Sequence, residues 1–241
     1  MIIAVIFANA FLALGTDEER PDPEAAALVA EMLSQKPPAD LEIKGLLRIR
    51  DARGKLSKVP ISYTVKLHAD RWEGIYETGS TDALPSERLT VVHRGLSPNQ
   101  YFFQRVSDAV RINGGQITLA GGQSAVPFAG SDFWLGDLGL EFLHWPKQRL
   151  VKDAIQIRNH RHCQVLESAN PNPADTNYAR VVSWVDREYG GLIYAIAYDA
   201  AGQKFKIFSL KSFSKGQVTG MEILNEKKDT RTYLELQPEP K

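Results

Sequence analysis

Hydrophobic and polar residues alternate with a period of two along most of the chain beyond residue 40. The clearest alternation covers residues 59–70, where Val59, Val65 and Leu67 belong to an apolar face. Because successive side chains of a β-strand point to opposite sides, this pattern predicts a strand with one buried face. Similar runs predict strands at residues 41–50, 72–78, 88–93, 101–105, 111–119, 162–168, 178–186, 192–198, 204–210, 218–224 and 230–236.

Turn sequences such as Asn113-Gly114 and Gly190-Gly191 separate these strands and leave only short connections. Short connections join antiparallel neighbours, whereas parallel strands need crossovers of a dozen or more residues. The chain is therefore predicted to be mainly β, with about eleven strands in a curved antiparallel sheet.

Two segments show the 3.6-residue period of an amphipathic helix instead. Residues 23–36 follow the N-cap residue Asp22 and begin with a proline, which suits the first helical position. Residues 131–145 form a weaker candidate, because Gly136 and Gly139 should each cost about 1 kcal/mol of helix stability. The apolar stripe of this second helix is Trp134, Leu138, Phe142 and Trp145. Two modest helices over the apolar face of a long sheet predict an apolar hollow between them.

The charge balance and the single cysteine exclude several classes of protein. The 29 Lys and Arg residues equal the 29 Asp and Glu residues, so no overall field attracts a phosphate backbone. This excludes a nucleic-acid-binding protein. Cys163 alone cannot form an internal disulfide or a cysteine-based zinc module. A length of 241 residues suits a single all-β domain.

The first fifteen residues differ from the rest of the chain. Residues 2–15 carry no charge, end in small residues and precede the acidic run Asp17-Glu18-Glu19. This layout is typical of the apolar core and cleavage site of a signal peptide, and the run is too short to span a bilayer comfortably. We therefore interpret residues 1–15 as a signal peptide and residues 16–241 as one exported domain. A buried N-terminal strand is the alternative.

Three acidic residues have a spacing that acid–base catalysis can use. Asp132 and Asp137 are five residues apart, and Asp137 and Glu141, four apart, would be neighbours on a helix, as paired carboxylates are. No nucleophile, partner base or metal signature accompanies them. We interpret Asp132 as the helix cap and the other two as solvent-facing, and expect no catalytic residue.

The sequence His160-Arg161-His162-Cys163 contains metal-type ligands. On a strand, His160 and His162 share one face and Cys163 points to the other, so fewer ligands converge than zinc requires. We expect neither a metal site nor a cofactor, and a buried, apolar role for Cys163.

Several segments resemble the LolA-like, outer-membrane lipoprotein-sorting protein family. The most specific is the run from Gly130-Ser131-Asp132-Phe133 to Asp137-Leu138, inside residues 128–148. Further similar segments are residues 161–167, 182–186, 198–202 and 230–236. The resemblance extends over residues 23–237. It implies an incomplete β-barrel of about eleven antiparallel strands with helices covering the concave apolar face, in agreement with the periodicity.

The resemblance also implies a function, because founding members of the family carry lipoprotein acyl chains across the periplasm in such a hollow. We expect a monomeric periplasmic carrier of lipoproteins or other acylated, apolar ligands, which acts between an inner-membrane donor and an outer-membrane acceptor. An envelope-stress sensor or protein-interaction module on the same fold is the alternative. The residues expected to form the apolar cavity and its lid are Leu28, Met32, Leu47, Val65, Leu67, Trp134, Leu138, Phe142 and Trp145.

Overall fold

A computed structural model describes residues 22–80, 85–106, 117–119, 123–151, 156–174, 176–214 and 217–237. The predicted signal peptide and most of the predicted strand at residues 111–119 lie outside the described residues. No helix within these ranges is long and apolar enough to cross a membrane.

The helix α1 (Pro23–Ser34) confirms the first predicted helix. The Asp22 carboxylate accepts hydrogen bonds from the backbone N–H groups of Glu24 (3.0 Å) and Ala25 (3.2 Å), which have no partner within the helix. The helix ends two residues earlier than predicted, because Gln35 already has extended backbone ahead of two prolines. Its buried face consists of Ala25, Leu28 and Val29.

Fourteen strands form one sheet within the described ranges, and every pairing is antiparallel. Their bounds are β1 (Leu41–Arg50), β2 (Leu56–Leu67), β3 (Trp72–Thr78), β4 (Ser86–Arg94), β5 (Ser97–Val106), β6 (Ile117–Leu119), β7 (Lys147–Leu150), β8 (Gln156–Arg158), β9 (Arg161–Ala169), β10 (Arg180–Asp186), β11 (Leu192–Tyr198), β12 (Lys204–Ser214), β13 (Gln217–Asn225) and β14 (Thr230–Gln237). The mainly β, antiparallel class is confirmed, but the strands outnumber the predicted eleven. The unpredicted strands β7 and β8 have four and three residues, too few for their alternation to be recognised.

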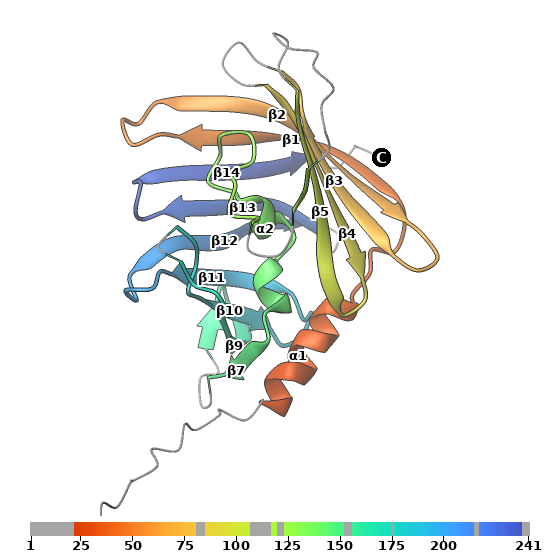
Figure 1. Cartoon of the computed structure of the whole chain (residues 1–241), viewed down its shortest axis with the longest axis vertical. Helices are drawn as coiled ribbons and strands as arrows, with labels where there is room; N and C mark the ends of the chain where they lie inside the picture. Colours follow the sequence, from red (N-terminus) through yellow and green to blue (C-terminus); the bar gives the residue numbers. More distant parts are fainter. Residues whose placement is uncertain are drawn as a thin grey trace, which may run out of the picture.

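The sheet consists of two meanders that meet at its centre. β1 to β6 are successive neighbours in one meander, and β9 to β14 are successive neighbours in the other, where β7 and β8 both pair with β9. The first and last strands, β1 and β14, lie side by side, with Lys44 opposite Gln237. β3, β4 and β5 turn across the direction of β12–β14, so the sheet is strongly curved (Figure 1). Its described end strands, β6 and β7, do not pair with each other, which makes it an incomplete barrel.

Residues 123–146, here called the connecting segment, join the two meanders on the concave side of the sheet (Figure 1). Their apolar side chains share one core with those of α1 and of both meanders. Phe128, Phe133 and Leu135 are at most 1% exposed in this core, together with Leu47 of β1 and Ile223 of β13. The predicted hollow is therefore largely filled by the chain's own side chains.

The connecting segment does not form the single helix predicted for residues 131–145. It contains one α-helical turn, α2 (Leu135–Leu138), and one 3-10 turn, η1 (Glu141–His144). Leu140 separates them with a φ of 49°, a left-handed conformation that ends the first turn. The apolar spacing thus serves two separate turns that are both buried in the core, and it does not mark one continuous helical stripe.

Candidate functional site

The structure places the nine predicted cavity and lid residues unequally. Seven of them share the core of the concave face, namely Leu28, Met32, Leu47, Trp134, Leu138, Phe142 and Trp145. Val65 is buried but belongs to neither large apolar cluster, and Leu67 is 36% exposed. This corrects the expectation that β2 buries one face along its full length. Leu67 is the last residue of a 12-residue strand that extends beyond the core.

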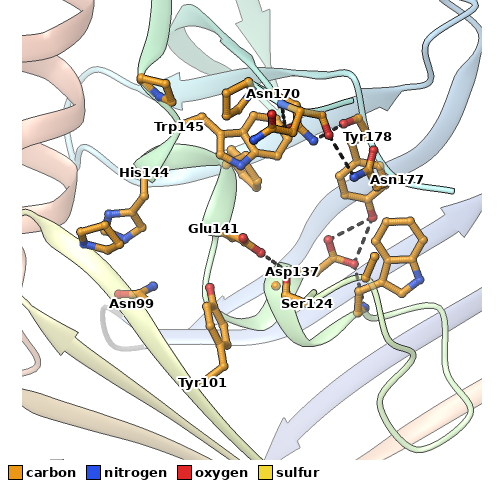
Figure 2. Close-up of a pocket in the computed structure, with 18 residues that line it drawn as sticks. Asn99, Tyr101, Ser124, Asp137, Glu141, His144, Trp145, Asn170, Asn177 and Tyr178 are labelled. Carbon is orange, nitrogen blue, oxygen red and sulfur yellow. Dashed lines mark hydrogen bonds between the residues drawn. The ribbon is translucent and has the colours of Figure 1, made fainter. Parts of the chain in front are cut away.

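A cavity of about 320 Å³ opens beside this core. It lies between η1, the start of β5 and the chain that precedes β10, and η1 itself contacts both β5 and β9. Three predicted residues, Trp134, Phe142 and Trp145, line it. The other lining residues that the argument uses are Asn99, Tyr101, Ser124, Asp137, Glu141, His144 and Tyr178 (Figure 2).

Side-chain hydrogen bonds from both meanders hold the wall of this cavity in place. The Asn99 amide on β5 donates to the carbonyl oxygen of Gly139 (2.7 Å), just before η1. On the other side, the Gln148 amide donates to the carbonyl oxygens of Phe142 (3.0 Å) and Trp145 (2.8 Å) at the end of η1. The Ser168 hydroxyl of β9 in turn donates to Gln148 Oε1 (2.7 Å). The connecting segment therefore bridges the two edges of the incomplete barrel.

A buried ion pair attaches α2 to β12. The Lys206 ammonium on β12 lies 3.2 Å from Asp137 Oδ2, and both side chains are at most 3% exposed. The ammonium also donates to the carbonyl oxygen of Asp132 (2.7 Å) and lies 3.6 Å from the ring centroid of Trp134. The Asp137 carboxylate accepts further hydrogen bonds from the Tyr178 hydroxyl (3.0 Å) and the Trp134 backbone N–H (2.8 Å).

Burial opposes both charges of this pair. It raises the pKa of the Asp137 carboxyl, although the positive charge of Lys206 partly offsets that effect. It also lowers the pKa of the Lys206 ammonium to about 8, against the attraction of the carboxylate. Each charge therefore depends on the other to remain ionised in the interior.

The structure overturns the interpretation of Asp132 as a helix cap, because Trp134 is the N-cap residue of α2, and that of Asp137 as solvent-facing, because Asp137 is buried. Asp132 instead accepts hydrogen bonds from the Thr232 hydroxyl of β14 (2.9 Å) and the Asn225 amide of β13 (3.2 Å). These partners follow Asp132 by about a hundred residues. The sequence signal for them is the pair of threonines Thr230 and Thr232, which share one face of β14 with Leu234 and Leu236 and which both donate to Asp132.

The polar groups of the cavity include two that the sequence did not single out. The Tyr101 hydroxyl and His144 Nε2 are buried and have no hydrogen-bond partner among the described residues. Burial raises the pKa of the Tyr101 hydroxyl and lowers the pKa of the His144 imidazole, so both are uncharged at neutral pH. The Ser124 hydroxyl donates to a carboxylate oxygen of Glu141, whose negative charge adds to the rise in the pKa of Tyr101 (Figure 2). Glu141 thus lines the cavity as a hydrogen-bonded acidic side chain.

The candidate metal ligands do not converge. Among the residues that the structure describes, no group of three or more His, Cys, Asp or Glu side chains could hold a metal ion. His160 and His162 are exposed, whereas Cys163 is buried. The prediction that Cys163 is a buried side chain is confirmed. It belongs to a second apolar cluster on the opposite face of β9–β11, away from the cavity.

A family model described as uncharacterized protein-like matches residues 112–238, slightly more than half of the chain. The match covers the connecting segment and the whole second meander. No curated protein matches this chain significantly.

Solved structures with similar folds cover both meanders. A DUF1329 family protein from Desulfovibrio piger has a TM-score of 0.71 at 17% identity, with 90% of this chain and 91% of that chain covered. A domain from Vibrio parahaemolyticus, provisionally named an outer-membrane lipoprotein-sorting protein, has a TM-score of 0.70 at 15% identity (89% and 91% covered). A LolA superfamily protein from Nitrosomonas europaea has a TM-score of 0.59 at 14% identity (88% and 91% covered). The LolA-like fold that the sequence predicted is confirmed.

Proposed function

We propose that the protein is a periplasmic binding protein for acylated or otherwise apolar ligands. The chain belongs to the family whose model, described as uncharacterized protein-like, matches residues 112–238, and its fold is LolA-like. We further propose that it takes part in outer-membrane lipoprotein sorting and carries acyl chains from an inner-membrane donor to an outer-membrane acceptor. The name of the Vibrio parahaemolyticus relative supports this direction.

The observation that carries the proposal is the cavity beside η1, lined by Trp134, Phe142 and Trp145. Its volume of about 320 Å³ lies at the lower end of the range for small-molecule sites, about 300–1,000 Å³. Each buried methylene contributes about 0.8 kcal/mol, so an inserted stretch of about eight methylenes contributes roughly 6 kcal/mol. A single acyl chain can therefore be held by the walls alone.

The filled core limits how such a ligand binds. The connecting segment occupies the concave face, and the Asp137–Lys206 pair attaches it to β12. Moving it out would expose several buried aromatic side chains and separate a buried ion pair, both of which are costly. We therefore propose that one acyl chain enters the existing cavity beside η1 and that the connecting segment stays in place.

The test is the binding of N-phenyl-1-naphthylamine, an uncharged apolar fluorophore, to the purified protein. Trp145→Ala removes a half-buried cavity wall and should weaken binding by at least fivefold beyond any loss explained by a lower urea midpoint. Trp184→Ala, on the opposite face of the sheet, is the matched control and should leave affinity unchanged. Equal affinity in the parent and Trp145→Ala would refute binding at this cavity.

Localisation has its own test. If residues 1–15 are a signal peptide, the protein recovered from the native host should be in the periplasmic fraction. Its N-terminal sequence should then begin between Phe11 and Asp17. An intact Met1 in a cytoplasmic fraction would contradict export.

A further inference from the structure

We infer that the cavity selects amphiphiles whose polar end is uncharged and carries hydroxyl groups, such as a monoacylglycerol, and discriminates against anionic ends such as a carboxylate or a phosphate. This inference rests on the proposed function, because it specifies the ligand class of the same cavity.

Two unsatisfied polar groups in the cavity wall favour a hydrogen-bonding ligand. The Tyr101 side chain is 2% exposed, and its hydroxyl has no partner among the described residues. His144 Nε2 lines the same cavity and also lacks a partner there. Buried polar groups without partners are rare and unfavourable, so a ligand that pairs with them gains affinity that a purely apolar ligand does not. A hydroxyl group can both donate and accept, which suits a phenol and a neutral imidazole alike.

The charges around the cavity disfavour an anion. Its described lining includes the carboxylates of Asp137 and Glu141 but no lysine or arginine. Lys206 does not line the cavity: it is completely buried and already paired with Asp137. The His144 imidazole cannot serve as a cation at neutral pH, because burial lowers its pKa. An entering carboxylate or phosphate would meet the like charge of Glu141 in the partly buried cavity wall, which disfavours an anionic end.

The remaining wall is suited to an apolar chain. Phe142 and Trp145 form an edge-to-face pair with ring centroids 6.4 Å apart, and Trp134 stacks on Tyr178 at 4.5 Å. All four side chains line the cavity. Apolar aromatic walls together with a few unpartnered polar groups are the general features of a site for an amphiphilic small molecule.

The experiment measures how well three ligands displace bound N-phenyl-1-naphthylamine at pH 7.5. The ligands have the same twelve-carbon chain and are 1-monolauroylglycerol, laurate and lauryl phosphate. The parent protein should bind monolauroylglycerol at least tenfold more tightly than either anion. Tyr101→Phe should weaken monolauroylglycerol binding three- to tenfold relative to the fluorophore's own affinity, which is measured for each variant. Because the Tyr101 hydroxyl has no described partner, its removal should not lower the urea midpoint. Tyr198→Phe, on β11 outside the cavity, is the control and should change neither affinity.

A second variant tests the charge. Glu141→Gln keeps the size of the side chain and an oxygen that can accept from Ser124. It should tighten laurate binding at least fivefold and change monolauroylglycerol binding by less than twofold.

The possible failures are distinguishable. Equal affinity for the three ligands, or tighter binding of an anion, would overturn the inference while leaving the proposed function in place. So would a Tyr101→Phe variant that weakens all three competitors alike. If the fluorophore binds independently of Trp145 and no competitor displaces it, the proposed function fails and the inference fails with it.

Discussion

The Lys206–Asp137 pair allows a quantitative test of how the connecting segment is held in the barrel. Lys206→Met keeps a side chain of similar length but removes the ammonium that lies 3.2 Å from Asp137 Oδ2 and 2.7 Å from the Asp132 carbonyl oxygen. The Asp137 carboxylate then remains buried with hydrogen bonds only from the Tyr178 hydroxyl and the Trp134 N–H. Removing one partner of a buried pair costs roughly 3–5 kcal/mol.

An upper bound on this cost follows from the carboxyl group itself. Rather than remain as a buried anion, it can take up a proton, which at pH 7 costs about 4 kcal/mol for an acid with an ordinary pKa of about 3.9. We therefore expect Lys206→Met to lower the free energy of unfolding by about 3–4 kcal/mol at pH 7.

The same reasoning fixes the pH dependence. Burial already raises the pKa of Asp137, and without the lysine it should rise further. A carboxyl whose pKa is higher in the folded than in the unfolded state stabilises the fold relatively at low pH, and this contribution is lost as the pH rises through the folded value. The difference between variant and parent should therefore shrink to about 1 kcal/mol near pH 4 and grow towards pH 7.

The assay is urea unfolding followed by tryptophan fluorescence from pH 4 to pH 8, with the parent measured at each pH. Adding Asp137→Asn to Lys206→Met removes the stranded charge. The amide oxygen still accepts from the Trp134 N–H, and the amide NH₂ donates to the Tyr178 oxygen. This double variant should recover at least half of the lost stability. A single-variant loss below about 1 kcal/mol at pH 7, a loss that does not vary with pH, or a double variant no more stable than the single one would refute the reasoning.

Two further substitutions test the packing on either side of the sheet. Gly139→Ala should lower the free energy of unfolding by about 1–3 kcal/mol despite the higher helix propensity of alanine, because its Cβ would lie 2.5 Å from the Tyr101 hydroxyl oxygen. Gly79→Ala, which meets nothing within 4 Å, is the control, and a stabilised Gly139→Ala would contradict the described packing. Cys163→Ala should cost about 1–3 kcal/mol in urea unfolding and leave ligand affinity unchanged. A loss of affinity beyond that explained by unfolding would place Cys163 in communication with the cavity.

Features that depend on neighbouring residues in the chain could be predicted from the sequence. α1 follows from Asp22 and from the apolar period of residues 23–36, because its cap and its buried face are local. The long strands of the first meander follow from their alternation, since one of their faces packs on the core, whereas β10 is buried on both faces. The short strands β7 and β8 lack enough residues to show such a period.

The connecting segment could not be predicted from its own sequence. Its apolar spacing resembles that of a helix, yet Gly136 is present where a Cβ would lie 2.6 Å from Ser124 Oγ. The sequence places Asp137 at the position of a helix-surface residue. Its buried partner, Lys206, is 69 residues later in the chain and cannot be identified from the local pattern. Tyr101 could not be predicted as a cavity residue for the same reason. In the alternating pattern of β5 it counts as a buried aromatic residue, and only the three-dimensional structure shows that its hydroxyl has no partner among the described residues.

The pairing of β1 with β14 has a consequence for how the chain reaches this structure. Each meander is built from hairpins between sequence neighbours, whose contacts form quickly, but the seam between them joins Lys44 to Gln237 and is as non-local as the chain allows. Until the final strand is available, β1 and β13 each present an unpaired edge, which is a template for association with other chains. The sheet therefore cannot be completed before β14 has been synthesised. Its last eight-residue strand determines when two separate halves become one domain.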